Sequence, residues 1–437
     1  MRDVEAALAS RWPESRIAPS LERIGDLTTV LGDPQATFPV IHIGGTNGKT
    51  STARMIDELL RGLGLRTGRY TSPHLESVTE RIALDGSPVD PELFAATYAE
   101  LSPYLAVVDA RHEVQLSFFE VLTAMAFATF ADAPVNVGVV EVGMGGAWDA
   151  TNVVDGKIAV LLPISIDHAE YLGDSVGEIA AEKAGIIKTE SVAVLAEQPP
   201  DALPQLQHRA LEAGASVVRE GMDFGVRKRE VAVGGQLLSL GGLAGSYDDV
   251  FLPLHGAHQA QNAVCALAAV EAFFGGDRAS LDTDLVRAAF AGVGSPGRLE
   301  VLRRSPTIMV DAAHNPASAR ALANALREEF TFASLVAVVA VLRDKDVVGI
   351  LEALAPVVDA VVVTHNSSPR VLPAADLVRH AVTVVGERTY RADALPDAID
   401  LAVQIAERDS VAGGAGVVVT GSVVTAGDAR RLLRSHR

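Results

Sequence analysis

A glycine-rich segment, HIGGTNGKTS at residues 42–51, has residue types that bind phosphate groups. It follows the apolar run PVIHI and precedes a helix-length stretch, so we expect a loop joining a strand to a helix. Backbone N–H groups of such a loop and the helix N-terminus attract anions, and Lys49 would reach terminal phosphates. The pattern G-x-x-x-x-G-K-[ST] requires glycine at position 43, where this chain has Ile43. A strand–helix turn with a solvated lysine is the alternative.

Three further residues that can bind a cation stand at or near the ends of expected strands: Ser72, Glu141 and His168. An unpaired carboxylate inside a buried strand is costly, so Glu141 requires a cation partner or a shifted pKa. Because carboxyl ends of parallel strands share one edge of a sheet, the three side chains could jointly hold a divalent ion. Taken singly, Glu141 is also explained by exposure at a strand end, and His168 by capping or packing.

The elements that must position these residues follow an α/β pattern, with short Val/Ile/Leu runs alternating with helix-length Ala/Leu/Glu stretches. Continuous apolar runs are typical of strands buried on both faces of a parallel sheet. The expected strands are 39–43, 66–71, 135–142, 158–166, 192–196, 307–310, 335–341, 359–364 and 416–420. The expected helices of the first part are 50–63, 91–103, 117–131, 175–186, 202–213 and 259–274.

The length of 437 residues predicts two domains, since a single core rarely grows so large. Gly and Pro cluster in GVGSPGRLE at 292–300, so we divide the chain into domains 1–294 and 295–437. Residues 215–254 are short, alternating and turn-rich, which predicts a small antiparallel element. We expect a ligand cleft between the domains and a hinge near 292–298.

Charge and composition exclude several classes of protein. A formal net charge of −18 argues against broad nucleic-acid or anionic-membrane binding, because both require a cationic surface. The single cysteine, Cys265, favours a reducing compartment and a small buried thiol rather than a catalytic one. The longest apolar runs are about half the length of a membrane span, and no N-terminal signal is visible. We therefore expect a cytoplasmic protein.

Motifs along nearly the whole chain resemble the Mur ligase superfamily and, within it, the folylpolyglutamate synthase/dihydrofolate synthase family of the bacterial type. GTNGKT matches that superfamily's variant of the phosphate-binding loop. The other matching stretches are YTSPHLESVTERI, SFFEVLTAMAF, EVGMGGAWDATN, ISIDHAEYLG, IAAEKAGIIK, HQAQNAVCAL, PGRLE, VDAAHNP, LRDKD and VTGSVVTAGDAR. TSPHL and EKAGI favour the folate branch over the cell-wall branch. The resemblance implies an N-terminal P-loop ATPase-like parallel sheet flanked by helices, and a smaller C-terminal Rossmann-like α/β domain.

The resemblance also implies roles for individual residues. ATP would bind to Thr46, Asn47, Gly48, Lys49, Thr50, Ser51, Asn262, Arg298, Asp311 and His314. Mg²⁺ would bind to Ser72, Glu141, His168 and Lys183, the last as a carbamate, although the residues alone predict a surface helix lysine. Lys49, Lys183 and His314 are the expected catalytic residues. A monovalent cation such as K⁺ is a further cofactor that the resemblance admits.

For the pterin-bearing substrate, the resemblance points to residues of two motifs, although the two phenylalanines among them could equally belong to the core. These residues are Ser117, Phe118, Phe119, Glu120, Trp148, Asp149 and Ala150. Two departures bear on this subsite: Ala147 stands where the family usually has arginine, and the segment 17–21 reads IAPSL.

The implied reaction is ATP-dependent ligation of L-glutamate to dihydropteroate, to the γ-glutamyl tail of a folate, or to both, through an acyl phosphate. A monomer suffices, because one chain holds both halves of the expected site. Two alternatives stay open. One is a Mur-type ligase acting on a UDP-sugar precursor, and the other is a P-loop nucleotide switch without ligase activity.

Overall fold

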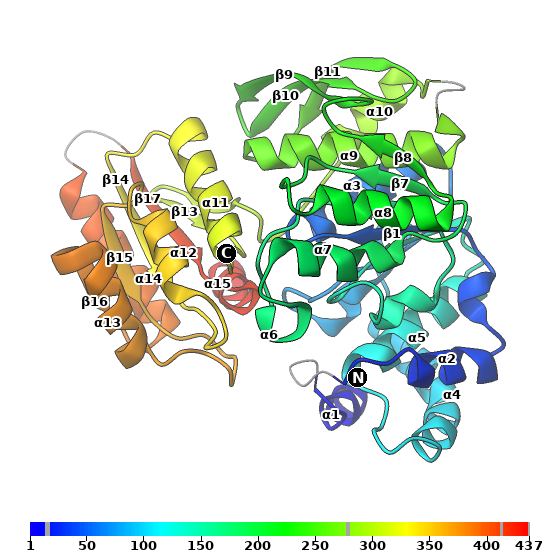
Figure 1. Cartoon of the computed structure of the whole chain (residues 1–437). Helices are drawn as coiled ribbons and strands as arrows, with labels where there is room; N and C mark the ends of the chain where they lie inside the picture. Colours follow the sequence, from blue (N-terminus) through cyan, green and yellow to red (C-terminus); the bar gives the residue numbers. More distant parts are fainter. Residues whose placement is uncertain (14–17, 277–279, 411–413, 436–437) are drawn as a thin grey trace. The chain divides into compact units, whose positions relative to one another are not determined.

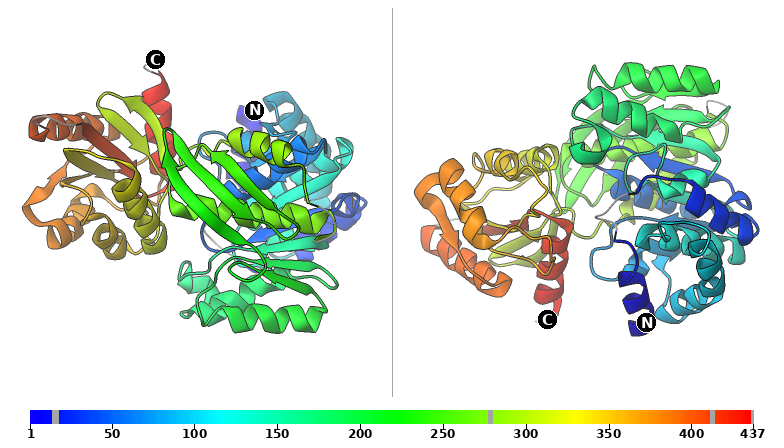
Figure 2. Two further views of the ribbon diagram at one scale, coloured as in Figure 1. Left: turned by 90° about the horizontal axis from the view of Figure 1, so that it is seen from above. Right: turned by 60° about the horizontal axis from the view of Figure 1, so that its bottom comes forward.

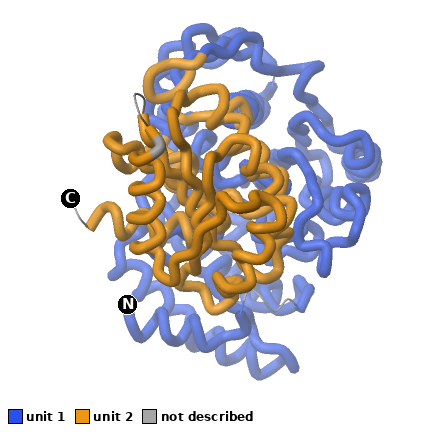
Figure 3. Tube along the Cα trace, turned by 90° about the vertical axis from the view of Figure 1, so that its left-hand side faces the viewer, with its two compact units in different colours: residues 1–230, 237–253, 259–293 blue, residues 231–236, 254–258, 294–437 orange. Residues whose placement is uncertain are grey.

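The computed structural model describes residues 1–13, 18–276, 280–410 and 414–435. The chain divides into two compact units, drawn in different colours in Figure 3. Unit 1 comprises Met1–Glu230, Leu237–Pro253 and Gln259–Val293, and unit 2 comprises Val231–Gln236, Leu254–His258 and Gly294–Arg437. The contiguous division at 294/295 stays a prediction, as do the cleft and the hinge.

Unit 1 contains an eight-stranded sheet with the order β4-β3-β2-β5-β1-β6-β7-β8. From β2 to β8 in this order neighbouring strands are parallel, whereas β3 pairs antiparallel with both β2 and β4. The strands are β1 (Val40–Gly44), β2 (Thr67–Tyr70), β3 (Ile82–Leu84), β4 (Ser87–Pro88), β5 (Val137–Glu141), β6 (Gly156–Leu161), β7 (Val192–Leu195) and β8 (Ser216–Arg219).

Helices cover this sheet, and the central strands β1 and β5 are buried along their whole length, as their continuous apolar sequences predict. The helices that lie wholly or mainly in unit 1 are α1 (Arg2–Ala9), α2 (Glu22–Val30), α3 (Lys49–Gly62), α4 (Pro91–Asp109), α5 (Phe118–Asp132), α6 (Ala169–Leu172), α7 (Val176–Lys183), α8 (Leu203–Ala213), α9 (Ala257–Phe273) and α10 (Thr283–Ala291) (Figure 1).

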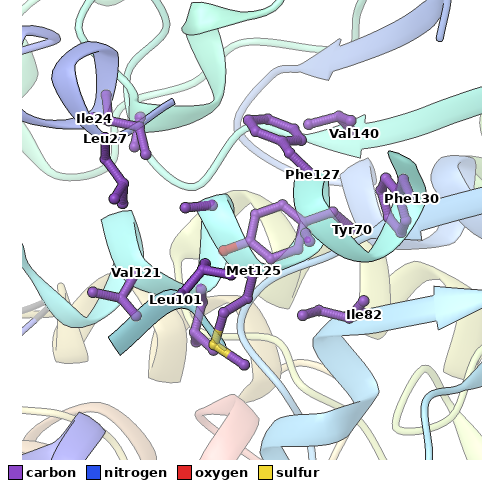
Figure 4. Packing of buried hydrophobic residues seen from close by; sticks show 14 of the residues in the cluster. Ile24, Leu27, Tyr70, Ile82, Leu101, Val121, Met125, Phe127, Phe130 and Val140 are labelled. Atoms are coloured by element: carbon purple, nitrogen blue, oxygen red, sulfur yellow. The ribbon is translucent and has the colours of Figure 1, made fainter. Parts of the chain in front are cut away.

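Two apolar clusters hold the helices on the sheet. In the larger one, Phe127 and Phe130 of α5 lie close to Tyr70 of β2 and Val140 of β5 (Figure 4). The second cluster contains residues of α7 and α8 together with Leu161 of β6 and other residues of β6 and β7. These clusters make the sheet a rigid support for the loops at its edge.

A separate three-stranded sheet has the order β11-β10-β9, with β9 (Gly225–Ala232), β10 (Gly235–Gly241) and β11 (Ser246–Leu252) (Figure 2). The two-residue connection between β9 and β10 requires these strands to be antiparallel. The antiparallel element expected at 215–254 is therefore correct for 225–252. It is wrong for 216–219, because β8 joins the main sheet parallel to β7.

Unit 2 contains a six-stranded sheet with the order β12-β13-β17-β14-β15-β16, parallel except for the pair β12–β13. Its strands are β12 (Glu300–Arg304), β13 (Thr307–Val310), β14 (Ser334–Val339), β15 (Ala360–Val363), β16 (Thr389–Arg391) and β17 (Ala415–Thr420). Its helices are α11 (Pro316–Glu329), α12 (Val347–Leu354), α13 (Ala374–Val385), α14 (Leu395–Asp409) and α15 (Val423–Ser435).

Side chains alternate between the two faces of β14. Leu335, Ala337 and Val339 belong to the apolar cluster that includes α11, α12 and α13, whereas Val336 and Val338 are fully buried outside that cluster. On the other side α14 packs against β14 and β17. The predicted class, α/β with two parallel-sheet parts, is confirmed.

Most expected elements are confirmed to within a few residues, with two corrections that affect the site. The strand expected at 158–166 ends at Leu161, so residues 162–166 are irregular chain and His168 does not follow a strand directly. The helix expected at 175–186 ends at Lys183, and a 3₁₀ turn follows it. Proline at 163 explains the first correction, because it cannot donate a backbone hydrogen bond to a sheet.

The close packing of β2 under α5 generates a stability prediction. A Cβ added at Gly68 would lie 2.5 Å from the ring of Phe130. We therefore expect Gly68→Ala to lower the free energy of unfolding by about 1–3 kcal/mol. Gly25 of α2 is the matched control, since a Cβ there meets nothing within 4 Å. Gly25→Ala should raise that free energy by about 0.5–1 kcal/mol. Urea unfolding measures both, and equal stability of Gly68→Ala and wild type would contradict the contact.

Candidate active site

The glycine-rich loop joins β1 to α3 in a conformation that depends on two glycines. Gly45 has φ of 129°, and a Cβ there would lie 2.7 Å from Cβ of Leu162. Gly48 has φ of 89° and is the residue before α3. Lys49 begins the helix and its Nζ donates to the carbonyl oxygens of Gly45 and Thr46, at 3.1 and 3.2 Å. The amine therefore lies over the loop, where it can neutralise an anion bound to the N–H groups.

Glu141 organises the adjacent edge of the sheet. Its side chain is 2% exposed, and both carboxylate oxygens lie 3.0 Å from Oγ1 of Thr50, which donates to them. The backbone N–H of Ser72 donates to the same carboxylate at 3.2 Å. The strand order β2-β5-β1 explains this convergence. Ser72 follows β2, Glu141 ends β5 and Thr50 follows β1, so the three residues lie at the same edge of the sheet. The carboxylate of Glu141 and the hydroxyl of Thr50 are hard oxygen ligands, which fits Mg²⁺.

His168, expected beside these residues, occupies a different structural context. It is the N-cap residue of α6, with a left-handed φ of 54°, and its Nε2 lies 3.9 Å from Oδ1 of Asp167. Within the described ranges, no three His, Cys, Asp or Glu side chains are grouped as a metal centre. The fit to Mg²⁺ therefore rests on Glu141 and the hydroxyl of Thr50. Ligation by Ser72 and by His168 stays a prediction.

The residues alone predict that Lys183 is a solvent-exposed helix lysine, and the structure shows that this prediction is wrong. Its side chain is 5% exposed at the end of α7. Burial is the largest cause that lowers the pKa of Lys183 to about 7, and the positive charge of Lys49 is the next. The carboxylates of Asp149 and Asp167 oppose this shift. Its amine makes no hydrogen bond or ion pair with any residue that the structure describes. At neutral pH a large fraction of this amine is uncharged and therefore nucleophilic.

The loop after β5 packs directly against the end of α7. Oε1 of Glu182 accepts hydrogen bonds from the N–H groups of Gly146 and Trp148, and the carbonyl of Glu182 accepts one from Ala147. A Cβ at Gly146 would lie 2.7 Å from Cα of Lys183, so only glycine permits this approach. Glu182 was missed by sequence reasoning, because nothing in EKAG indicates a partner 36 residues away.

Asp149 and Ala150, expected at the substrate subsite, are buried in the same loop. The carboxylate of Asp149 accepts hydrogen bonds from the N–H groups of Met144 and Thr151, at 2.8 and 3.0 Å, and from the Thr151 hydroxyl. Burial raises the pKa of Asp149, and these hydrogen bonds oppose that shift. Thr151 in turn contacts His42 of β1. Asp149 therefore holds the shape of the loop.

Ser117 and Glu120, from the other substrate motif, form the capping box of α5. The hydroxyl of Ser117 accepts from the N–H of Glu120, and Oε2 of Glu120 accepts from the N–H of Ser117. Arg23, which sequence reasoning missed, donates to Oε1 of Glu120 at 3.0 Å. Both side chains thus have structural partners within unit 1. Residues 18–21 of the expected IAPSL segment are described, whereas Ile17 lies outside the described residues.

Phe118 and Phe119 lie at the start of α5, partly buried against the larger core. Phe119 lies 5.9 Å from Tyr70 between ring centroids, and its ring would lie 2.4 Å from a Cβ at Gly143. The guanidinium of Arg81 lies 5.1 Å from the ring centroid of Phe118. These contacts make core packing part of the role of both rings.

Asn262 of α9 lies beside the glycine-rich loop, as expected. A Cβ at Gly48 would lie 2.5 Å from Oδ1 of Asn262, whose Nδ2 donates to Gln259. Nε2 of Gln259 lies 3.4 Å from the hydroxyl of Ser51. The side chains of α9 thus complete one side of the loop.

The remaining expected residues, Arg298, Asp311 and His314, lie together in unit 2. The carboxylate of Asp311 accepts from the N–H groups of Leu299 and Ala313, both at 2.8 Å. Burial raises the pKa of Asp311, and the charge of Arg298 is the first influence that opposes the shift. Nδ1 of His314 lies 3.0 Å from the carbonyl oxygen of Ala312, which can only accept, so this nitrogen donates.

Comparisons with known proteins find similar sequences over most of the chain. Residues 43–270 match the model of the Mur ligase middle domain, and residues 297–423 match that of the Mur ligase glutamate ligase domain. A dihydrofolate synthase/folylpolyglutamate synthase of Mycobacterium tuberculosis is 55% identical, covering 98% of this chain and 93% of its own. The Escherichia coli protein of that name is 32% identical, over 82% and 81% of the two chains.

Solved structures of known proteins are also similar to this chain. Folylpolyglutamate synthase of M. tuberculosis complexed with ADP and AMPPCP has a TM-score of 0.95 and 54% identity, covering 99% of this chain and 98% of its own. The FolC protein of E. coli complexed with DHPP and ADP has a TM-score of 0.85 and 29% identity, over 100% and 98%. None of the helices described is both long and apolar enough to span a membrane.

The buried amine of Lys183 predicts a pH dependence of stability. A lysine pKa lowered on folding means that the unfolded chain binds more protons between about pH 7 and 10.5, so stability rises with pH across that window. We expect the free energy of unfolding of wild type, relative to that of Lys183→Met, to rise by up to about 1.4 kcal/mol per pH unit. Urea unfolding at several pH values in bicarbonate-free buffer measures it. A difference that does not change with pH would contradict the shift.

Proposed function

Because the chain belongs to the Mur ligase family and, within it, to the folylpolyglutamate synthases/dihydrofolate synthases, it is an ATP-dependent ligase of glutamate to folates, and we propose that it accepts both dihydropteroate and tetrahydrofolate. The observation that supports the ATP-dependent chemistry is the convergence of Lys49, Thr50, Ser72 and Glu141 at one edge of the unit 1 sheet. The proposal of both acceptors rests on the relatives named dihydrofolate synthase/folylpolyglutamate synthase. This arrangement combines an anion-binding loop with a buried carboxylate.

The proposed chemistry has two steps. An oxygen of the acceptor carboxylate attacks the γ-phosphorus of ATP, the bond to the β-phosphate oxygen breaks, and ADP leaves. The amine of glutamate then attacks the acyl carbon of the acyl phosphate, inorganic phosphate leaves, and the nitrogen loses a proton. Positioning and charge neutralisation suffice for phosphoryl transfer, and these are what Lys49 and the N–H groups of the loop provide.

We assign the Mg²⁺ that such ligases require to Glu141, with the hydroxyl of Thr50 beside it. Ser72, whose backbone N–H donates to the same carboxylate, is proposed as a further ligand. Bound there, the ion would supply positive charge to the phosphate oxygens. His168 is proposed as a further ligand, on resemblance alone. K⁺ remains a proposed additional cofactor, and none of the described contacts assigns it a place.

Carbamylation of Lys183 is proposed on two supports, the resemblance and the buried amine. An uncharged amine attacks CO₂, a C–N bond forms and the nitrogen loses a proton, which leaves a carboxylate in place of a buried cation. The nearby positive charge of Lys49 would stabilise this anion. His314 is proposed to act on the nucleotide together with Arg298 and Asp311, again by resemblance.

We propose that the pterin lies near Phe118, Phe119 and Trp148, beside the loop that Glu182 and Asp149 hold in shape. Ala147 supplies no charge at this subsite, so recognition there relies on aromatic and backbone contacts. The enzyme is proposed to work as a cytoplasmic monomer without nucleic acid, in keeping with its net charge of −18 and single cysteine.

The test of function is the release of ADP that depends on Mg²⁺ and L-glutamate, with dihydropteroate and with tetrahydrofolate as acceptors. We expect turnover with both, and a product whose mass has increased by one glutamate residue. Lys49→Ala should lower kcat by at least about 100-fold, because a charge that stabilises the transferring phosphoryl group is lost. Lys157→Ala, at an exposed position of β6, is the matched control and should leave kcat unchanged.

Each alternative makes a different prediction in the same assay. A ligase for a UDP-sugar precursor would release ADP only with that acceptor. A nucleotide switch would hydrolyse ATP at a rate that neither acceptor nor glutamate changes. Either result would overturn the assignment, and turnover with only one of the two acceptors would overturn the proposal of dual use.

A further inference from the structure

Arg54 of α3 and Arg69 of β2 lie near the acidic side chains Asp57, Glu80 and Glu141, and Arg81 is a third arginine of unit 1. Arg69 forms a buried ion pair with Asp57. Arg81 is 2% exposed, donates to Nδ1 of His74 at 3.0 Å and stacks on Phe118. Arg54 differs from both, because its guanidinium makes no hydrogen bond or ion pair with any residue in the described part of the chain.

The acidic groups near Arg54 are engaged elsewhere. The carboxylate of Glu80 accepts from the backbone N–H groups of Leu75, Glu76 and Ser77, at 2.9, 3.1 and 2.9 Å. Asp57 accepts from Arg69 and from the hydroxyl of Thr67. Glu141 accepts from Thr50 and Ser72. None of these carboxylates therefore forms an ion pair with Arg54, although their charges reach it.

The position of Arg54 on α3 directs it toward the reaction site. Arg54 follows Thr50 by four residues, so the two lie on the same face of the helix, one turn apart. The negative charges of Glu80, Asp57 and Glu141 all act on the guanidinium of Arg54, and the last of these is the carboxylate that Thr50 contacts. Arg54 remains partly exposed, so a ligand can reach it.

Burial, followed by the positive charge of Arg69, lowers the pKa of Arg54 to about 10, so the guanidinium is still charged at neutral pH. A charged group that is partly removed from water without a partner is unfavourable, and a bound anion would relieve that cost. A guanidinium binds a carboxylate through two parallel hydrogen bonds, which also orients the carboxylate plane.

We propose that Arg54 binds the carboxylate of the acceptor that becomes phosphorylated. The acceptor carboxylate must approach both the γ-phosphate and Glu141, which repel it, and Lys49 is engaged at the loop. Arg54 offsets that repulsion and turns one carboxylate oxygen toward the phosphorus. The inference rests on the proposed function and adds to it a residue that selects and orients the acceptor rather than the nucleotide.

The test combines a change in the protein with a change in the ligand. Wild type and Arg54→Met are titrated with tetrahydrofolate and with the analogue in which the reacting carboxylate is a carboxamide. Wild type should bind the carboxylate about 10- to 100-fold more tightly than the carboxamide, and Arg54→Met should lose most of that preference. The dissociation constant of ADP should be unchanged, and Arg54→Lys should restore part of the preference.

Arg66→Met is the matched control, since Arg66 is exposed and pairs with exposed Asp85. It should leave the preference for the carboxylate as it is in wild type. If Arg54→Met still prefers the carboxylate over the carboxamide, the proposal is overturned. If that preference persists and ADP binds more weakly, Arg54 binds a phosphate group instead. If wild type shows no glutamate-dependent turnover, the proposed function is overturned instead. Failure of the proposed function is therefore distinguishable from failure of the proposal for Arg54. Thermal unfolding confirms that each variant is folded.

Discussion

The carboxylate of Glu141 is the group on which the rest of the site depends. It ends the central strand β5, between β2 and β1, and it accepts hydrogen bonds from Thr50 at the start of α3 and from the backbone after β2. A buried carboxylate is unfavourable unless it is hydrogen-bonded or beside a cation. The fold meets the first condition with the hydroxyl of Thr50 and the N–H of Ser72, and the proposed Mg²⁺ meets the second.

Two positively charged groups of unit 1 share one property. The side chains of Lys183 and Arg54 are mostly or partly removed from water, and neither side chain has a hydrogen-bonding partner among the described residues. In a chain with a net charge of −18, unpaired cations gathered near one strand edge make a local site for anions. One of them is proposed to become an anion by carbamylation and the other to bind the acceptor. Both proposals follow from the same observation, a side-chain amine or guanidinium that is removed from water and has no hydrogen-bonding partner among the described residues.

The sequence predicted the architecture and the chemical types of the site, because strand periodicity and the glycine-rich loop are local signals. It did not predict where His168 would lie, although Pro163 is a local signal that β6 ends before residue 166. The burial of Lys183 could not be read from α7 alone, because it depends on the glycine loop that packs on this helix from 36 residues away. Glu182 and Arg23 escaped notice for the same reason, since their partners are distant in the chain.

The measurement that tests the central claim most directly is the Mg²⁺ dependence of ATP turnover in Glu141→Gln. Glutamine keeps the size of the side chain and an oxygen that accepts from Thr50, but it removes the negative charge. We expect a folded variant whose half-saturating Mg²⁺ concentration is at least about tenfold higher than that of wild type. An unchanged Mg²⁺ dependence would show that Glu141 is only a structural acceptor and would contradict the account of the site.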